Sequence, residues 1–150
     1  MNSTETIDQT QTHTMGKEPK IAAFCCYHSA YEAADVAGSM HLRVPEGVRL
    51  IRVPCTGRVD VLHILRAVEK GYDGILVLGC HEENCKFLRG NILARKRVAY
   101  ARELLTEAGA GEKDLEFHSV AANQPHRFAR VVCAMRDRLA SERAEHAEQT

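Results

Sequence analysis

The sequence lacks the features that most simply indicate nucleic-acid or membrane binding. It contains no tryptophan and only 5% aromatic residues, so a platform of stacked aromatic side chains for single-stranded nucleic acid is not expected. The 20 basic and 20 acidic residues cancel, which leaves no bulk attraction to nucleic acid or to an acidic membrane. No apolar run approaches the ~18 residues that a membrane-spanning helix needs. We therefore expect neither a nucleic-acid partner nor a membrane span.

The two ends of the chain are polar, whereas the middle is not. Residues 1–18 carry no apolar segment of the kind found in signal peptides, which favours a disordered tail and a cytoplasmic protein. Residues 19–140 have the length and composition of a single domain with an ordinary core. Residues 141–150 alternate glutamate with alanine and histidine, and we expect a polar tail that frays from a helix end.

Short apolar segments alternate with helical periodicity through the middle of the chain. Residues 74–80 form a continuous Ile/Leu/Val run, typical of a strand that is buried on both faces of a parallel sheet. Strands are predicted at 20–26, 48–55, 74–80 and 115–120, and helices at 31–40, 60–70, 92–108 and 125–139. This alternation predicts an α/β fold with a doubly wound, mostly parallel sheet in a flavodoxin-like three-layer sandwich.

Five of the six cysteines follow the predicted strands. The carboxyl ends of parallel strands share one edge of the sheet, where ligands bind. Cytoplasmic thiols are rarely structural disulfides, and clustered thiols are more often metal ligands or redox groups. The predicted metal ligands are Cys25, Cys26, Cys55, Cys80 and Cys85. Cys133 lies in the last predicted helix without a neighbouring thiol, and we interpret it as a core residue.

Several thiols at one edge suit either zinc or an iron–sulfur cluster. Cys80 and Cys85 have the C-x4-C spacing that loops of [2Fe–2S] ferredoxins also use, whereas structural zinc sites favour paired knuckles. The spacing favours a [2Fe–2S] cluster. A zinc-stabilised adaptor domain and a thiol redox protein without a cluster remain alternatives. Neighbouring strand residues point to opposite faces, so we expect one of Cys25 and Cys26 to be a ligand and the other to lie in the core.

Two further residues are candidates for contact with the cofactor. Arg58 lies close to Cys55, and a cluster bound by four thiolates carries net negative charge that an arginine would stabilise. His81 follows Cys80 directly and is a candidate neighbour of the cluster. The basic segment 86–97 is a weak candidate for a partner surface or, equally, a solvated helix face. No catalytic dyad is found.

At these residues the chain resembles the small iron–sulfur (delta) subunit family of methyl-viologen-reducing hydrogenases. The similarity extends from about Pro19 to Leu139. Three motifs carry it: Phe24-Cys25-Cys26, with Tyr31 and Ala34-Asp35 after it; the run from Arg52 to Asp60, which contains C-x-G-R-x-D; and the run from Leu76 to Cys85, which contains G-C-H-x-x-x-C. Where the family pattern has C-C-x-x-C, this chain has Ser29 at the third cysteine.

The resemblance implies a subunit that carries a [2Fe–2S] cluster. It further implies that the subunit relays electrons from a hydrogenase or formate dehydrogenase to a flavin-containing, heterodisulfide-reductase-like partner. The expected partners are therefore larger flavin and iron–sulfur oxidoreductase subunits, and the expected subunit is a non-catalytic component of their complex.

Overall fold

A computed structural model describes residues 18–110 and 114–149. Of the predicted disordered tail, residues 1–17 therefore lie outside the described part of the chain. The elements are β1 (Ile21–Cys26), α1 (Ala30–Ser39), β2 (Val48–Val53), α2 (Val61–Glu69), β3 (Gly74–Gly79), α3 (Gly90–Glu107), β4 (Asp114–Ser119) and α4 (Pro125–Glu148). Two short 3₁₀ turns, η1 (Thr56–Arg58) and η2 (Glu82–Asn84), follow β2 and β3.

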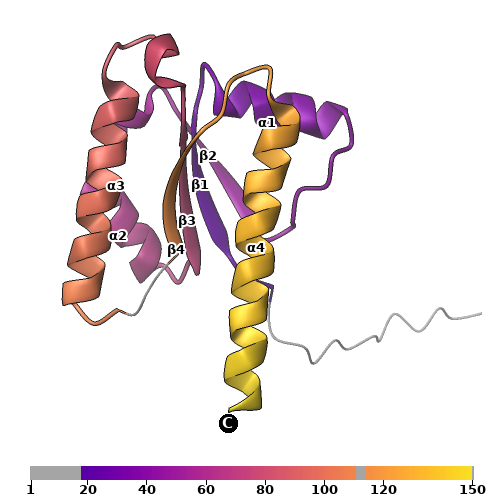
Figure 1. The fold of residues 1–150 in the computed structure, drawn as a ribbon, viewed down its shortest axis with the longest axis vertical. Helices are drawn as coiled ribbons and strands as arrows, with labels where there is room; N and C mark the ends of the chain where they lie inside the picture. Colours follow the sequence, from indigo (N-terminus) through magenta and orange to yellow (C-terminus); the bar gives the residue numbers. More distant parts are fainter. Residues whose placement is uncertain (1–17, 111–113, 150) are drawn as a thin grey trace, which may run out of the picture.

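The strands form a parallel sheet in the order β2-β1-β3-β4, which confirms the predicted fold class. Helices α2 and α3 cover one face of the sheet, and α1 and α4 cover the other (Figure 1). The result is the predicted three-layer sandwich.

The pleat of β1 divides its side chains between the two layers of the core. Ile21, Ala23 and Cys25 pack in the cluster that includes residues of α1 and α4. Ala22 and Phe24 pack in the cluster that includes residues of α2 and α3. Every residue of β1 and β3 is buried, because both central strands are covered on both faces.

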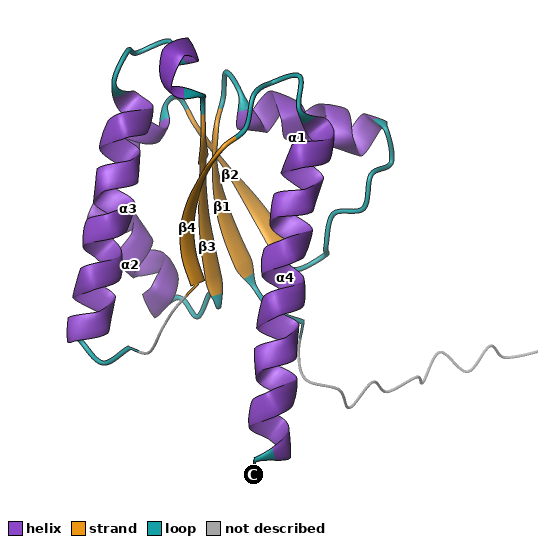
Figure 2. Ribbon diagram, viewed as in Figure 1, coloured by secondary structure: helices purple, strands orange, loops and turns teal. Residues whose placement is uncertain are grey.

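The chain reverses its direction across the sheet between β1 and β3. From β1 it crosses to β2 on one side, and the next crossover brings β3 to the other side of β1. A crevice for ligands forms at such a switch point, outside the carboxyl ends of the strands. These ends, with the loops that follow them, lie at the top of Figure 2. We call this end of the molecule the cysteine edge, because Cys26, Cys55, Cys80 and Cys85 lie there.

Helix α4 is longer than the sequence pattern indicates. The apolar stripe ends at Leu139, but the helix continues to Glu148 and extends past the sheet (Figure 1). The added turns are rich in alanine and glutamate, which are strong helix formers and need no buried face. The described part of the polar segment 141–150 therefore lies in this helix or at its end.

In the described part of the chain, no helix is long and apolar enough to cross a membrane.

Candidate metal centre

Four cysteines from separate loops form one buried cluster at the cysteine edge. Cys26 is the last residue of β1, Cys55 immediately precedes η1, Cys80 follows β3 and Cys85 follows η2. Their exposed fractions are 2%, 6%, 5% and 8%. None of the four is in a disulfide. Three strand ends thus deliver four free thiols to one place, as the sequence predicts for Cys55, Cys80 and Cys85 and for one of Cys25 and Cys26.

The four thiols are arranged as two close pairs. The Sγ atoms of Cys26 and Cys80, at the ends of adjacent strands, are 3.6 Å apart. The thiols of Cys55 and Cys85 form the second pair of neighbours, since a Cβ added at Gly90 would lie 2.2 Å from Cys55 Sγ and 3.5 Å from Cys85 Sγ. In the described residues, no three His, Cys, Asp or Glu side chains are arranged to hold one metal ion. The four thiols thus form one cluster that contains two close pairs.

Cys25 lies away from this cluster because adjacent side chains on a strand point to opposite faces. It is fully buried in the core layer beneath α1 and α4. Its thiol donates to the carbonyl of Ala23, at 3.5 Å. Burial raises the pKa of the Cys25 thiol to about 12, and the neighbouring Cys26 adds to the rise. Cys133 is also separate: its thiol donates to the carbonyl of Arg43, at 3.3 Å.

Backbone N–H groups point at two of the four sulfurs. The amide of Gly57 in η1 donates to Cys55 Sγ, at 3.4 Å. Burial opposes ionisation of Cys85, but the amides of Asn91, Phe87 and Gly90 donate to its sulfur and hold its pKa below the usual value. Gly90 and Asn91 are the first residues of α3, where unpaired N–H groups and the helix dipole favour negative charge, and Phe87 lies in the loop before it. The loops are thus arranged to stabilise a thiolate at Cys85.

Two glycines allow the loops around the thiols to approach each other closely. A Cβ added at Gly90 would lie 2.2 Å from Cys55 Sγ, and one added at Gly57 would lie 2.8 Å from the Cα of Gly90. Real Cβ contacts of this length do not occur, so neither position has room for a side chain without movement of the loops. The beginning of α3 and η1 therefore meet backbone to backbone above the cluster.

Two buried polar residues, at the starts of α3 and α1, lie near Cys80. The Asn91 amide donates to the carbonyl of Cys80, at 3.1 Å, and so ties the start of α3 to the end of β3. The Ser29 side chain is buried, and its hydroxyl has no hydrogen-bond partner among the described residues. Burial raises the pKa of Cys80 to about 11, and the Ser29 hydroxyl, which faces it, opposes that rise. An unpartnered buried donor beside a thiol suits a negatively charged sulfur.

Gly90 and Asn91 are functional candidates that the sequence analysis missed. The signal available was the Gly-Asn pair at the start of a helix, a short way beyond Cys85. By itself that signal indicates only a helix beginning.

The basic residues near the cysteines have diverse contacts. Arg58, a predicted cofactor neighbour, is exposed at the end of η1. His81, the other predicted neighbour, bonds through Nε2 to Oε1 of Gln124, at 3.0 Å. Within the basic segment, Arg97 donates to the carbonyls of Gly57 and Val59 and so supports the loop that carries Cys55. Arg95 pairs with Glu82, at 2.7 Å.

One known family matches nearly the whole domain of this chain. A model of the family described as "Methyl-viologen-reducing hydrogenase, delta subunit" matches residues 21–141. This chain belongs to that family. All four clustered cysteines of the delta-subunit domain lie inside the matched region.

Curated relatives of this delta-subunit chain have similar lengths. It is 38% identical over 122 residues to the vhu iron–sulfur subunit of the F420-non-reducing hydrogenase from Methanocaldococcus jannaschii, and the match covers 81% of this chain and 91% of the relative. The protein of the same name from Methanococcus maripaludis is 41% identical over the same shares of the two chains.

A third relative contains the delta-subunit domain as a small part of a much longer chain. This relative is one subunit of the ferredoxin/F(420)H(2)-dependent CoB-CoM heterodisulfide reductase of Methanosarcina acetivorans, and it is 35% identical over 114 residues. The match covers 76% of this chain but only 14% of the relative.

Proposed function

We propose that the chain is an electron-transfer subunit that holds a [2Fe–2S] cluster through Cys26, Cys55, Cys80 and Cys85. The observation that carries the proposal is the arrangement of four buried thiols as two pairs at one edge of the sheet. A [2Fe–2S] cluster takes four thiolate ligands, two on each iron. When bound, such a cluster accepts and releases one electron without a change in its ligands.

The residues around the thiols fit this group. Backbone amides hold the pKa of Cys85 below its usual value. Burial raises the pKa of Cys55, and the Gly57 amide opposes that rise, so both sets of amides favour the thiolate, the form that binds metal. The buried Ser29 hydroxyl has no partner among the described residues and faces Cys80, so it is free to donate to a negatively charged sulfur. All four cysteines are buried from water, and the loops at Gly57 and Gly90 approach each other closely beside Cys55. The backbone amides and the Ser29 hydroxyl are therefore suited to stabilise negative charge on the cysteine sulfurs.

The names of the relatives support the same function. The vhu proteins are named as iron–sulfur subunits of a hydrogenase, and the longer relative is named as part of a heterodisulfide reductase. We infer that this chain passes electrons between a hydrogenase or formate dehydrogenase and a flavin-containing, heterodisulfide-reductase-like partner. Free thiols of this kind persist in a reducing compartment, which favours the cytoplasm.

The arrangement of the thiols supports two alternative functions less well. A zinc-stabilised adaptor needs ligands around one ion, which the pairwise arrangement supports less well than it supports a two-iron cluster. A thiol enzyme acting through Cys25 or Cys26 needs an accessible sulfur, but both residues are buried.

Anaerobic purification with metal analysis tests the proposal. We expect about two irons per chain, a red-brown colour, and an EPR signal after reduction with dithionite. A preparation that is colourless and free of iron after reconstitution, or that holds one zinc per chain, would contradict it.

A further inference from the structure

Two loops at the cysteine edge expose apolar side chains beside the thiols. Tyr27 follows Cys26, and Phe87 and Leu88 follow Cys85. Their exposed fractions are 45%, 55% and 82%. We call Tyr27, Phe87 and Leu88 the apolar patch. The loops meet through His28, whose ring lies 5.0 Å from that of Tyr27 and 6.3 Å from that of Phe87, centroid to centroid.

Leu88 combines two features that folding alone does not favour. Its φ of 61° lies in the left-handed region that residues with a Cβ rarely adopt. Its side chain is also the most exposed in the patch, so it gains little from burial. The loop is nevertheless held in place, because the Leu88 amide donates to the carbonyl of Cys85, at 3.0 Å. Local strain of this kind is concentrated at sites that serve function.

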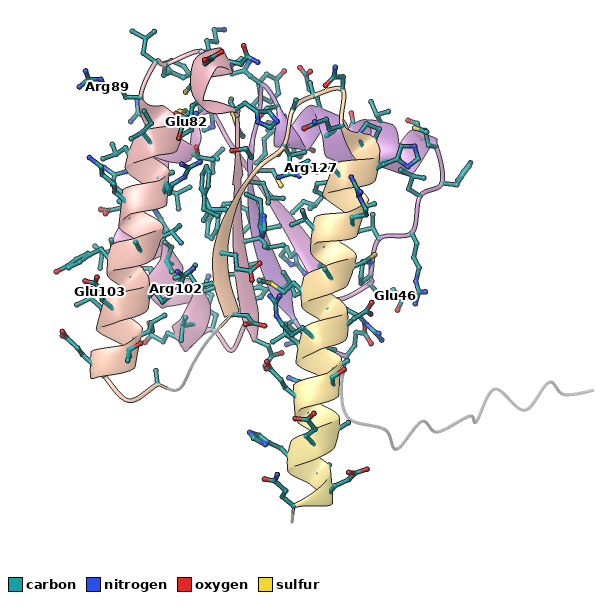
Figure 3. The ribbon with its side chains drawn as sticks, in the orientation of Figure 1. Glu46, Glu82, Arg89, Arg102, Glu103 and Arg127 are labelled. Atoms are coloured by element: carbon teal, nitrogen blue, oxygen red, sulfur yellow. The ribbon has the colours of Figure 1, made fainter. Side chains whose placement is uncertain are left out.

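Three basic side chains lie beside the apolar patch. Lys86 and Arg89 flank Phe87 and Leu88 in the sequence, and the Arg52 guanidinium lies 5.3 Å from the centre of the Tyr27 ring. Arg52, Lys86 and Arg89 are exposed, and none has a carboxylate partner in the part of the chain that the structure describes. Figure 3 shows Arg89 pointing away from the body of the molecule at this end.

We propose that the apolar patch, with its basic rim, is the docking surface for a redox partner whose contact face is apolar and rimmed by Asp and Glu. The inference rests on the proposed electron-transfer function and specifies the partner's chemistry. Charge complementarity favours an acidic partner, since unpaired basic groups steer such a protein and fix its orientation. A second copy of this chain is a poorer occupant, because it would bring the same positive rim against this one. A partner seated here lies directly over the loops that hold Cys26 and Cys85.

Binding of two redox proteins of opposite charge tests the proposal with the full-length chain. The probes are a fluorescently labelled acidic plant-type ferredoxin and a labelled basic cytochrome c, and binding is measured by anisotropy at low and high salt. We expect the chain to bind the acidic probe more tightly than the basic one, and we expect salt to weaken that binding.

Three variants locate the binding surface. We expect Phe87→Ser and Leu88→Gly each to weaken binding of the acidic probe at least about tenfold. Leu88→Gly also removes the backbone strain, so its melting temperature should not fall. Tyr100→Ser is the matched control, because Tyr100 is as exposed as Phe87, at 55%, but lies farther along α3. Its binding should be unchanged.

Three results would overturn the docking surface: equal affinity for the two probes, unchanged binding by both patch variants, or a dimer in light scattering that Leu88→Gly dissociates. The last result would assign the patch to a second copy. A visible spectrum of each sample reports the cluster separately. A colourless chain that still shows patch-dependent binding would retain the surface and reject the cluster.

Discussion

The two ends of the sheet differ in the groups that lie there and in how those groups are paired. At the end of the sheet where the strands begin, which we call the amino end, basic side chains of α4 pair with acidic residues from distant parts of the sequence. Arg143 pairs with Asp73 and Arg138 with Asp114, at 2.6 and 3.1 Å. At the cysteine edge Arg95 pairs with Glu82, but the exposed Arg52, Lys86 and Arg89 have no carboxylate partner among the described residues and lie next to four buried thiols.

The contacts at the amino end serve the stability of the fold, whereas the groups at the cysteine edge are those of a candidate functional site. Ion pairs at the amino end connect α4 to the starts of the strands and need nothing outside the chain. A hollow of about 660 Å³ also lies at that end, lined by residues that include Lys20, Lys70 and Tyr72, but no thiol is among its lining residues. The cysteine edge instead combines four buried thiols with exposed apolar side chains and with basic side chains that have no carboxylate partner among the described residues. Such groups indicate a site for a cofactor and a partner.

Replacing single cysteines should give the largest effect and should distinguish the role of Cys26 from that of the adjacent Cys25. We expect Cys26→Ala to lose the [2Fe–2S] spectrum because it removes a ligand. Cys25→Ala should keep the iron and lose only about 1–2 kcal/mol of stability, because it leaves a small cavity in the core. Iron content and chemical denaturation of both variants check this. Loss of iron in Cys25→Ala with retention in Cys26→Ala would reverse the assignment.

Adding one methyl group at Gly90 should have a smaller but still specific effect. The new Cβ would lie 2.2 Å from Cys55 Sγ, so the loops must separate. We expect Gly90→Ala to lower the iron content and to cost roughly 1–3 kcal/mol of stability. Iron analysis and urea denaturation measure the two effects.

Gly38→Ala is the matched control for this change. Gly38 is in α1, and nothing lies within 4 Å of an added Cβ there. That variant should keep its iron and gain about 0.5–1 kcal/mol from helix propensity. Full iron content in Gly90→Ala would show that the close approach is not needed for the site.

Breaking an ion pair at the amino end should have the smallest effect. Arg138 contacts Asp114 and Glu116, and all three side chains are partly exposed, so Arg138→Ala should cost under about 1 kcal/mol and leave the iron unchanged. Burial opposes ionisation of Glu116, but hydrogen bonds from His118 and Arg138 hold its pKa below the usual value.

The pH dependence of stability gives the sign of this contribution. A carboxyl group with a lowered pKa stabilises the fold above its unfolded pKa, and the stabilisation is lost as pH falls through the folded value. The parent should therefore lose more stability than Arg138→Ala on acidification below about pH 4.5. Equal losses in urea titrations at several pH values would show that the pair contributes nothing.

The sequence by itself determined the order of the elements and the edge on which the thiols lie. Apolar runs such as 74–80 require burial on both faces, and parallel strands bring their carboxyl ends to one edge. This reasoning identified the three-layer fold and placed Cys55, Cys80 and Cys85 together. It also established that Cys25 and Cys26 point in opposite directions, because side chains alternate along a strand.

Only the tertiary structure decided which side chains meet. Cys26 rather than Cys25 joins the other thiols because α1 and α4 cover the face of β1 that carries Cys25. The contact of Gly90 with Cys55 and the apolar patch likewise join loops that are far apart in the sequence. Local patterns record which face of an element is buried. They do not record which loops of other strands close over it, since that depends on strand order and register across the whole sheet.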